Sequence, residues 1–235
     1  MPGPVVPLIR LADRVRALSS TGLDLVGLPA VDPPPRTVAS LTQFDSIVSW
    51  YGTNRPEFRD AVAALGLPFR FVPALPDEYY VGYAGDFFLE QVGGSGPALP
   101  RIPCPRLDGR FAAIHPFSGS ARKNWPIEQF RRVAERLDIP ACWCAGPAEV
   151  LPGATRFDDL YELAQWLARA RLYIGNDSGI THLAAAVGTP VVAVFGASDP
   201  VVWGPRGDRV RVLGSAGRWP DVEEVIAAAL KLLAS

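Results

Sequence analysis

The stretch YIGNDSGITHLAAAVGTPVVAVFGASDP, residues 173–200, decides the fold class of this 235-residue chain. Within it, a polar Asn-Asp-Ser-Gly turn separates two apolar runs. The pattern predicts a strand over 172–175, a helix of small residues over 179–187 and a strand over 191–195. A strand, a crossover helix and a second apolar strand form the repeating unit of a parallel sheet covered on both faces. The stretch therefore predicts an α/β protein.

The same alternation continues through the second half of the chain. We predict strands over 111–115 and 141–144, and a helix that starts at Pro126, because proline is favoured at the first helical position. Acidic pairs at capping-box spacing open two further helices: Asp159 with Glu162, and Asp221 with Glu224.

The first half is less regular. Apolar residues at helical spacing predict a helix over 8–18, and the segment 23–28 (LDLVGL) predicts a strand. The proline-rich segment 32–36 predicts an extended break. The elements expected after it are a short helix, a strand over 46–50, a helix near 55–65, a strand over 69–72 and an irregular or amphipathic stretch over 79–88.

These elements predict two doubly wound α/β halves with parallel sheets. We expect a reduced N-terminal domain over 1–95 and a linker rich in Gly and Pro over 96–110. A regular, Rossmann-like C-terminal domain is expected over 111–235.

The composition argues against several classes of protein. Lys plus Arg number 23 and Asp plus Glu 24, so the net charge of −1 supplies no field to attract a nucleic acid. Three cysteines and two histidines are a poor supply for a metal site, and we expect no metal and reduced, buried thiols in a cytosolic protein. No segment has the length of a membrane span or the pattern of a secretory leader, so we expect a soluble protein.

Polar clusters follow three of the predicted strands, at the sheet edge where parallel α/β proteins bind ligands. They cover residues 115–125, 176–182 and 196–206. The first offers hydroxyls, backbone N–H groups and Lys123 to a phosphate, while Ser178 and Gly179 open a helix whose amides can face an anion. The carboxylate of Asp177 would repel a phosphate and suits sugar hydroxyls better. We therefore expect a nucleotide-activated sugar at this edge.

Each cluster also has a purely structural interpretation. Asp177 and Ser178 could cap the helix, and Lys123 could be a solvated charge. His182 could be a satisfied structural residue, and residues 196–200 could be a plain turn. The convergence of all three clusters on one sheet edge favours ligand binding.

Two motifs in this half resemble those of glycosyltransferase family 9, the ADP-heptose:lipopolysaccharide heptosyltransferases. One is the stretch quoted above together with Gly-Pro at 204–205, and the other is IHPFSGSARKNWPIEQFRRVAERL at 114–137. Together they cover residues 111 to about 205. The resemblance implies a GT-B fold, in which two Rossmann-like domains face each other across a cleft. It also implies an inverting transfer that needs neither a metal nor a cofactor, with the donor held mainly by the C-terminal domain.

The resemblance assigns a donor site residue by residue. Lys123 and the turn 118–120 would bind the donor phosphates, Asp177 would hold sugar hydroxyls, and Ser178 and His182 would help to seat the diphosphate and the sugar. The expected donor-binding residues are His115, Ser118, Gly119, Ser120, Lys123, Asp177, Ser178, Gly179 and His182.

The N-terminus departs from the family pattern. Members of the family begin with a strand, a Gly-Asp turn and a helix, and that Asp is the expected general base for the acceptor hydroxyl. Here only MPGPVV precedes the predicted helix, and Pro4 follows Gly3. The candidate bases are therefore other acids of the first half: Asp13, Asp45, Glu57 and Asp86.

We expect a glycosyltransferase that moves a heptose-like sugar from a nucleoside-diphosphate donor, with ADP as the expected nucleotide, to a saccharide or glycolipid acceptor. The main alternative is a sugar-nucleotide-binding protein without transfer activity, because the Gly-Asp loop is absent. Two further alternatives are another GT-B enzyme, such as a sugar-nucleotide 2-epimerase, and a purely structural module. We expect a cytoplasmic protein with at most peripheral contact with the inner membrane, and a second copy or a partner chain could complete the cleft.

Overall fold

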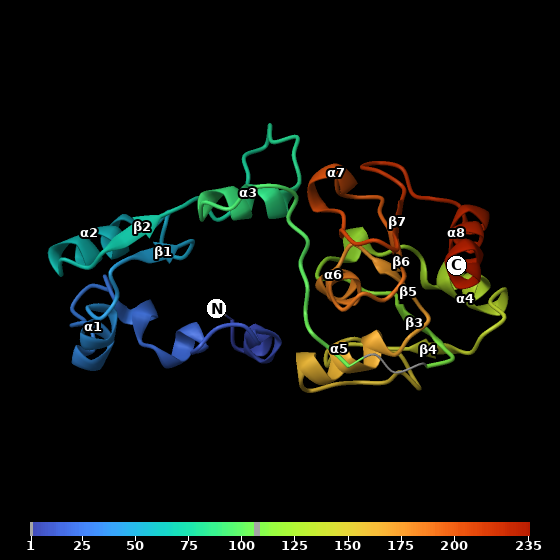
Figure 1. Cartoon of the computed structure of the whole chain (residues 1–235), viewed down its shortest axis with the longest axis horizontal. Helices are drawn as coiled ribbons and strands as arrows, with labels where there is room; N and C mark the ends of the chain where they lie inside the picture. The colour runs from blue at the N-terminus through green and yellow to red at the C-terminus, as the bar shows by residue number, and fades with distance from the viewer. Residues whose placement is uncertain (1, 106–108) are drawn as a thin grey trace. The chain divides into compact units, whose positions relative to one another are not determined.

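The computed structural model describes residues 2–105 and 109–235, which fold as two compact units. The smaller unit comprises the chain up to Tyr80 together with Asp86–Gly96, and the larger comprises Val81–Gly85 and Pro97–Ser235. Residues 106–108 of the predicted linker lie outside the described residues. Each unit has its own parallel sheet (Figure 1).

The smaller unit contains short elements around a two-stranded parallel sheet, in which Ile47 pairs with Phe69. Helix α3 (Ala84–Gln91) starts in the larger unit and continues into the smaller one. The elements before it are the 3₁₀ turns η1 (Gly3–Leu8), η2 (Leu18–Ser20) and η3 (Leu23–Leu25), helices α1 (Pro35–Leu41) and α2 (Pro56–Ala64), and strands β1 (Ile47–Ser49) and β2 (Phe69–Phe71).

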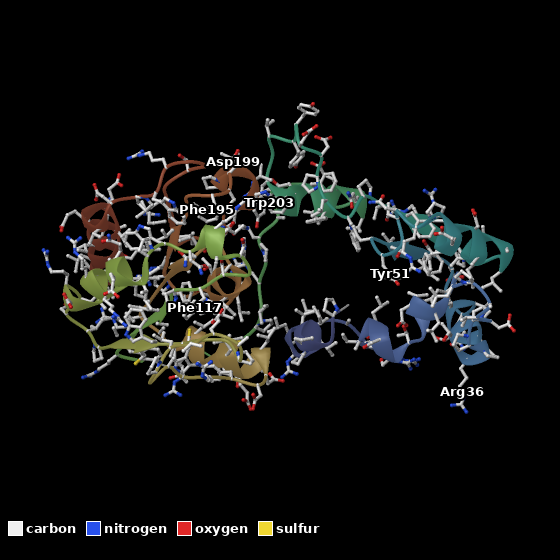
Figure 2. The ribbon with its side chains drawn as sticks, turned by 180° about the vertical axis from the view of Figure 1, so that it is seen from behind. Arg36, Tyr51, Phe117, Phe195, Asp199 and Trp203 are labelled. Atoms are coloured by element: carbon white, nitrogen blue, oxygen red, sulfur yellow. The ribbon has the colours of Figure 1, made fainter. Side chains whose placement is uncertain are left out.

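Phe58 of α2 is the centre of the small core. Its ring is fully buried and meets the rings of Tyr51, Phe69 and Phe71 edge-on. Gly52 has φ of +76°, and a Cβ there would lie 2.2 Å from the Phe58 ring, so this turn requires glycine. The smaller unit therefore depends on aromatic packing more than on regular secondary structure. Figure 2 shows Tyr51 in this unit, and the exposed Arg36 pointing away from α1.

Three predictions for the N-terminal segment are wrong, two wholly and one in part. The helix predicted over 8–18 is absent, because the expected apolar stripe finds no core: Leu11, at its centre, is 86% exposed. The strand predicted over 23–28 is instead a 3₁₀ turn, since Gly22 and Gly27 adopt left-handed backbone angles on either side of it. The predicted extended break over 32–36 also ends early, because α1 begins at Pro35.

The larger unit is a five-stranded parallel sheet with strand order β4-β3-β5-β6-β7. Its predicted strands and helices are confirmed, apart from shifts of a residue or two, whereas α7 and β7 were not predicted. The strands are β3 (Ala112–His115), β4 (Ala141–Trp143), β5 (Leu172–Asn176), β6 (Val191–Val194) and β7 (Val210–Leu213). The helices are η4 (Ala121–Lys123), α4 (Ile127–Glu135), α5 (Leu160–Ala168), α6 (Gly179–Ala186), α7 (Pro200–Trp203) and α8 (Val222–Ala234).

Helices cover both faces of this sheet. Helices α4 and α8 pack together on one face, while α5 and α6 cover the other (Figure 1). Alternate strand residues divide between the faces, so Ile114 and Ile174 point into the α4–α8 core, whereas His115 and Tyr173 belong to the α6 face. Phe195, directly after β6, is fully buried in this unit (Figure 2).

The predicted helix caps form with one difference. Asp221 and Glu224 make a complete capping box at α8, as predicted. Asp159 caps α5 by accepting hydrogen bonds from the Tyr161 and Glu162 amides, and the structure shows no reciprocal bond from the Glu162 side chain.

Three further properties follow from the described residues. Of the three cysteines, only Cys144 is buried; Cys104 and Cys142 are half-buried, which corrects the expectation that all three are buried. No helix in the described ranges is long and apolar enough to cross a membrane. Within the same ranges, no group of three His, Cys, Asp or Glu side chains could hold a metal ion.

Replacement of Phe58 by Ala should unfold the smaller unit while the larger stays folded. Loss of a buried Phe costs about 3–5 kcal/mol, which is a large share of the stability of so small a core. Of the six tryptophans, Trp50 belongs to the smaller unit, and its indole N–H donates to Gln91. The ¹⁹F NMR signal of 5-fluorotryptophan at position 50 should therefore collapse toward its unfolded shift.

The matched control is Phe44→Ala, because Phe44 is 55% exposed. That variant should keep the folded Trp50 signal. Equal effects of the two substitutions would contradict the assignment of Phe58 as the centre of this core.

Candidate functional site

The strand order creates a crevice at the carboxyl edge of the larger sheet. From β3 the chain crosses to β4 on one side and then to β5 on the other. The connections that leave β3 and β5 therefore diverge, and ligands of open α/β sheets bind at such a switch point. Two of the predicted polar clusters, 115–125 and 176–182, begin at these two strand ends.

A pocket of about 210 Å³ opens at this point. It lies between the loops after β3 and β4 and the start of α6, with α5 as one wall. Its lining includes His115, Gly119, Cys144, Glu149, Phe157 and Gly179. A larger hollow of about 480 Å³ lies at the amino ends of β6 and β7, but none of the predicted site residues lines it.

Gly119 and Gly179 line the pocket without any structural need for glycine. A Cβ on either residue would meet nothing within 4 Å, and neither has a left-handed backbone. Gly175 and Gly196 differ, because a Cβ there would lie 2.3 Å from the Tyr173 hydroxyl and 2.0 Å from the Trp219 ring. The first two glycines thus leave space at the pocket surface, whereas the other two accommodate the protein itself.

His115 ends β3 on the side of the sheet that faces α6, and its side chain is buried. Its Nε2 lies 3.0 Å from Oε2 of Glu149, which comes from the loop after β4. A carboxylate only accepts hydrogen bonds, so Nε2 carries the proton and Nδ1 presents a lone pair. Among the described residues, no donor reaches Nδ1. Burial lowers the pKa of His115, which more than offsets the nearby Glu149 carboxylate, so the ring is neutral.

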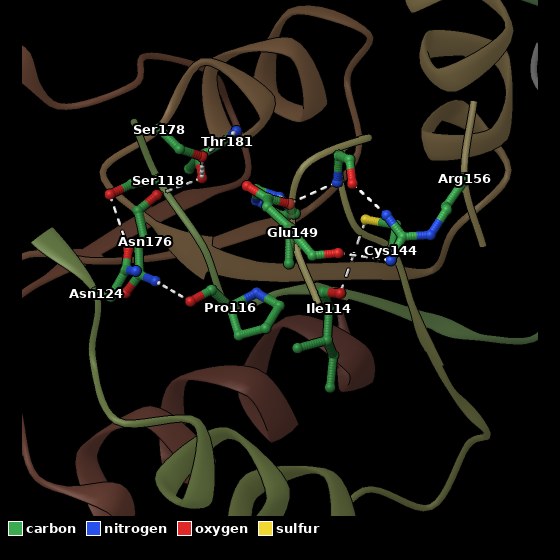
Figure 3. Close-up of polar contacts among 12 residues, drawn as sticks. Ile114, Pro116, Ser118, Asn124, Cys144, Glu149, Arg156, Asn176, Ser178 and Thr181 are labelled. Carbon is green, nitrogen blue, oxygen red and sulfur yellow. Dashed lines mark hydrogen bonds and ion pairs between the residues drawn. The ribbon is translucent and has the colours of Figure 1, made fainter. Parts of the chain in front are cut away.

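Glu149 is held in its loop by several backbone contacts. Its Oε2 accepts from the Gly146 amide at 2.5 Å, while Arg156 donates to the carbonyls of Gly146 and Glu149 (Figure 3). Cys144 lies beside this loop and donates to the Ile114 carbonyl, and burial raises its pKa to about 12. This wall of the pocket therefore carries a fixed carboxylate and a protonated thiol.

Asn176 joins the ends of β3 and β5. The side chain is fully buried, and its Oδ1 accepts from the Trp125 amide at 2.9 Å. Its Nδ2 donates to the Pro116 carbonyl at 2.8 Å (Figure 3). Both bonds reach the loop after β3, which carries Lys123. The asparagine of the Asn-Asp-Ser-Gly turn is therefore structural, a role that its position in the sequence did not indicate.

Ser178 is the N-cap of α6, so the structural interpretation holds for its hydroxyl. Ser178 Oγ accepts from the Thr181 amide and lies 3.1 Å from Thr181 Oγ1. Thr181 Oγ1 also contacts the buried Tyr173 hydroxyl and donates to the Asn176 carbonyl. Gly179 and Ile180, the first residues of the helix, line the pocket. The N-terminal end of α6, the positive end of its dipole, therefore lies at the pocket.

Asp177, Lys123 and Ser198 form the second part of the site. Lys123 Nζ lies 2.6 Å from Asp177 Oδ2, and Ser198 Oγ donates to the same oxygen at 2.5 Å. The Asp177 side chain is 8% exposed, against 38% for Lys123. His182 bonds to the Trp203 backbone. Burial has the largest effect on its pKa and lowers it, although the nearby Asp177 carboxylate acts to raise it.

The structure brings the predicted donor residues together in the larger unit. His115, Ser118, Gly119, Ser178 and Gly179 line the pocket, Lys123 and Asp177 form the adjacent ion pair, and His182 lies near that pair. The Ser118 hydroxyl also bonds to Asn124 and to the Ser120 backbone, and so shapes the loop in which Ser120 is exposed. The sequence did not single out Asn176, Thr181 or Ser198 within the predicted clusters 176–182 and 196–206, and Glu149 lies outside all three clusters, 34 positions from its partner His115.

The four candidate bases lie in the smaller unit. Asp13, Asp45 and Glu57 are exposed, whereas Asp86 is half-buried in the first turn of α3. Asp13 lies on a bend between η1 and η2, not on the predicted helix. Donor candidates and base candidates thus belong to different units.

Acidification should destabilise the larger unit before its carboxylates titrate. Burial lowers the pKa of both histidines, so the unfolded chain binds protons at a higher pH than the folded one. Stability contributed by neutral His115 and His182 is present above the unfolded pKa of about 6.5 and is lost as the pH falls below it. The melting temperature should therefore drop between pH 7.5 and 5.5, and drop less in His115→Gln and His182→Gln variants. The same pH slope in wild type and both variants would contradict this.

Comparisons with known proteins agree with this geometry. The family model for glycosyltransferase family 9 (heptosyltransferase) matches residues 97–231, more than half of the chain. Lipopolysaccharide heptosyltransferase 3 of Escherichia coli (strain K12) is 49% identical over 40% of this chain and 33% of its own length. Lipopolysaccharide core heptosyltransferase OpsX of Haemophilus influenzae is 27% identical over 39% of this chain and 32% of its own length. The chain thus matches about a third of these curated relatives.

Two solved structures share the fold. The E. coli ADP-heptose lps heptosyltransferase II matches with a TM-score of 0.54 and 16% identity, over 93% of this chain and 88% of that one. A family 9 glycosyl transferase from Veillonella parvula matches with a TM-score of 0.51 and 20% identity, over 94% and 80% of the two chains. These likenesses confirm the predicted α/β fold of the GT-B type with two parallel sheets. The chain belongs to glycosyltransferase family 9, the heptosyltransferase family.

Proposed function

We propose that the larger unit binds a nucleoside-diphosphate sugar at its switch point and that the protein transfers the sugar to a saccharide or glycolipid acceptor. The proposed donor is ADP-linked and heptose-like, and the acceptor a lipopolysaccharide core saccharide, by analogy with the names of the curated relatives. The observation that carries the proposal is the pair Gly119 and Gly179. Both leave open space at the pocket, and that space admits a ligand against the backbone.

The pocket offers the groups that a nucleotide requires. The N-terminal amides of α6 suit a phosphate, because they donate hydrogen bonds and carry the positive end of the helix dipole. The bare Nδ1 of His115 can accept from a ligand hydroxyl or N–H group. These groups bind the nucleotide without a metal ion.

Lys123 and Asp177 can serve the diphosphate and the sugar while still paired. A lysine ammonium has three N–H donors, so one can remain on Asp177 while the others reach phosphate oxygens. Lys123 and Ser198 both contact Oδ2 of Asp177, and Oδ1 takes part in neither contact. We assign Oδ1 as the acceptor for sugar hydroxyls.

Inverting transfer also requires a general base that removes the proton of the acceptor hydroxyl as it attacks the anomeric carbon. The candidates are Asp13, Asp45, Glu57 and Asp86 of the smaller unit. With a glycolipid acceptor, the protein would act at the cytoplasmic face of the inner membrane, through peripheral contact.

Gly179→Ala and Gly119→Ala should each weaken ADP binding about tenfold or more without loss of stability. The added methyl group enters space that the folded protein leaves empty, so only a ligand would meet it. Calorimetry with ADP and thermal melting would measure the two effects separately.

Gly3→Ala is the matched control, because its Cβ would also lie in nearly open space, 3.9 Å from the nearest side chain, but in the smaller unit. Unchanged ADP affinity in both pocket variants would overturn the proposed site.

Sugar recognition should separate from phosphate recognition. Lys123→Ala should weaken ADP and ADP-heptose alike, because both carry the diphosphate. Asp177→Ala should weaken only ADP-heptose. Calorimetry with ADP, UDP, GDP and ADP-heptose would test both statements and identify the nucleotide.

Transfer itself is tested by ADP release from ADP-heptose in the presence of a lipopolysaccharide-derived acceptor. Tight donor binding with no acceptor-dependent release would favour the alternative, a sugar-nucleotide-binding protein without transfer activity. Absence of binding to every nucleotide would overturn the proposed function as a whole.

A further inference from the structure

We propose that Ser198 is a positioning residue that orients the Asp177 carboxylate toward the donor sugar. The inference rests on the proposed function, because it assigns how the sugar-reading oxygen is held. Ser198 lies in the first motif but was not among the predicted donor-binding residues, and it contacts Asp177 from a different strand end, that of β6.

Two donors fix the same oxygen of Asp177. Ser198 Oγ and Lys123 Nζ lie 2.5 Å and 2.6 Å from Oδ2. The Asp177 amide also donates to the Val194 carbonyl at 3.2 Å, so the backbone before the side chain is tied to β6. Because two donors hold Oδ2 from different directions, the carboxylate cannot rotate freely, and Oδ1 keeps a single orientation.

The turn after β6 places Ser198 rigidly. A Cβ on Gly196 would lie 2.0 Å from the Trp219 ring, so that ring packs directly against the turn. Immediately after Ser198, Asp199 caps α7 by accepting from the Val201 amide at 2.8 Å. Ser198 therefore lies between the Gly196–Trp219 contact and the cap of α7. Figure 2 shows Asp199 and Trp203 at the two ends of this short helix.

Lys123 alone cannot fix the carboxylate in the same way. Its side chain has four rotatable methylene groups and is partly exposed, and an ammonium is a point charge with no preferred plane. Without Ser198, Asp177 is free to rotate until both oxygens face the ammonium. Oδ1 is then no longer directed at the sugar, although the charge on Lys123 is still available to the phosphates.

The test compares the affinities of ADP and ADP-heptose, measured by calorimetry on the full chain. Ser198→Ala should weaken ADP-heptose about tenfold, in keeping with a hydrogen bond to a charged group, and ADP less than twofold. Ser198→Thr keeps a hydroxyl and should retain the wild-type ratio of the two affinities. In steady-state assays, Ser198→Ala should raise KM for the donor more than it lowers kcat.

The pair Ser198→Thr and Ser198→Val keeps the test decisive if Ser198→Ala folds poorly, because the two side chains have similar shape and differ by the hydroxyl. Ser215→Ala, on an exposed serine of the same unit, is the control and should change neither affinity. One result would overturn the role of Ser198 alone: Asp177→Ala lowers the affinity for ADP-heptose relative to ADP, whereas Ser198→Ala and Ser198→Val leave that ratio unchanged. If wild type binds ADP-heptose no more tightly than ADP, the proposed sugar role of Asp177 fails first.

Discussion

The two hydrogen bonds of the Asn176 amide are the constraint on which the site depends. They join the end of β5 to the loop after β3, in a fully buried position where neither partner could turn to water. That loop carries Lys123, and the residue after Asn176 is Asp177. The ion pair between them, and the approach of the Gly119 turn to the start of α6, both follow from this junction.

A good part of the larger unit could be predicted from its sequence, because its signals are local. Continuous apolar runs, caps such as Asp221 with Glu224, and polar residues directly after strands each act within a few positions. The contacts that complete the site act over long distances. Glu149 meets His115 across 34 positions and Ser198 meets Asp177 across 21, and no sequence spacing indicates either pair.

The fold of the smaller unit, by contrast, could be predicted only in part from its sequence. Helical periodicity over 8–18 is present, but a stripe of apolar residues forms a helix only where a core receives it, and Leu11 remains exposed. What organises this unit is the packing of three aromatic rings around Phe58 of α2, one from the turn after β1 and two from β2. Such packing leaves little trace in the periodicity of the sequence.

The fit between Tyr173 and Gly175 also has an evolutionary consequence. The Tyr173 hydroxyl passes over position 175 to reach Thr181, and the space that it uses is the space that any larger residue at 175 would need. The two positions are therefore not free to vary separately. A side chain at 175 becomes tolerable only after the phenol at 173 is lost, and loss of the phenol removes a bond from the threonine that supports the α6 cap. Among descendants of this chain, residues 173, 175 and 181 should change as a set, in an order that begins with the tyrosine.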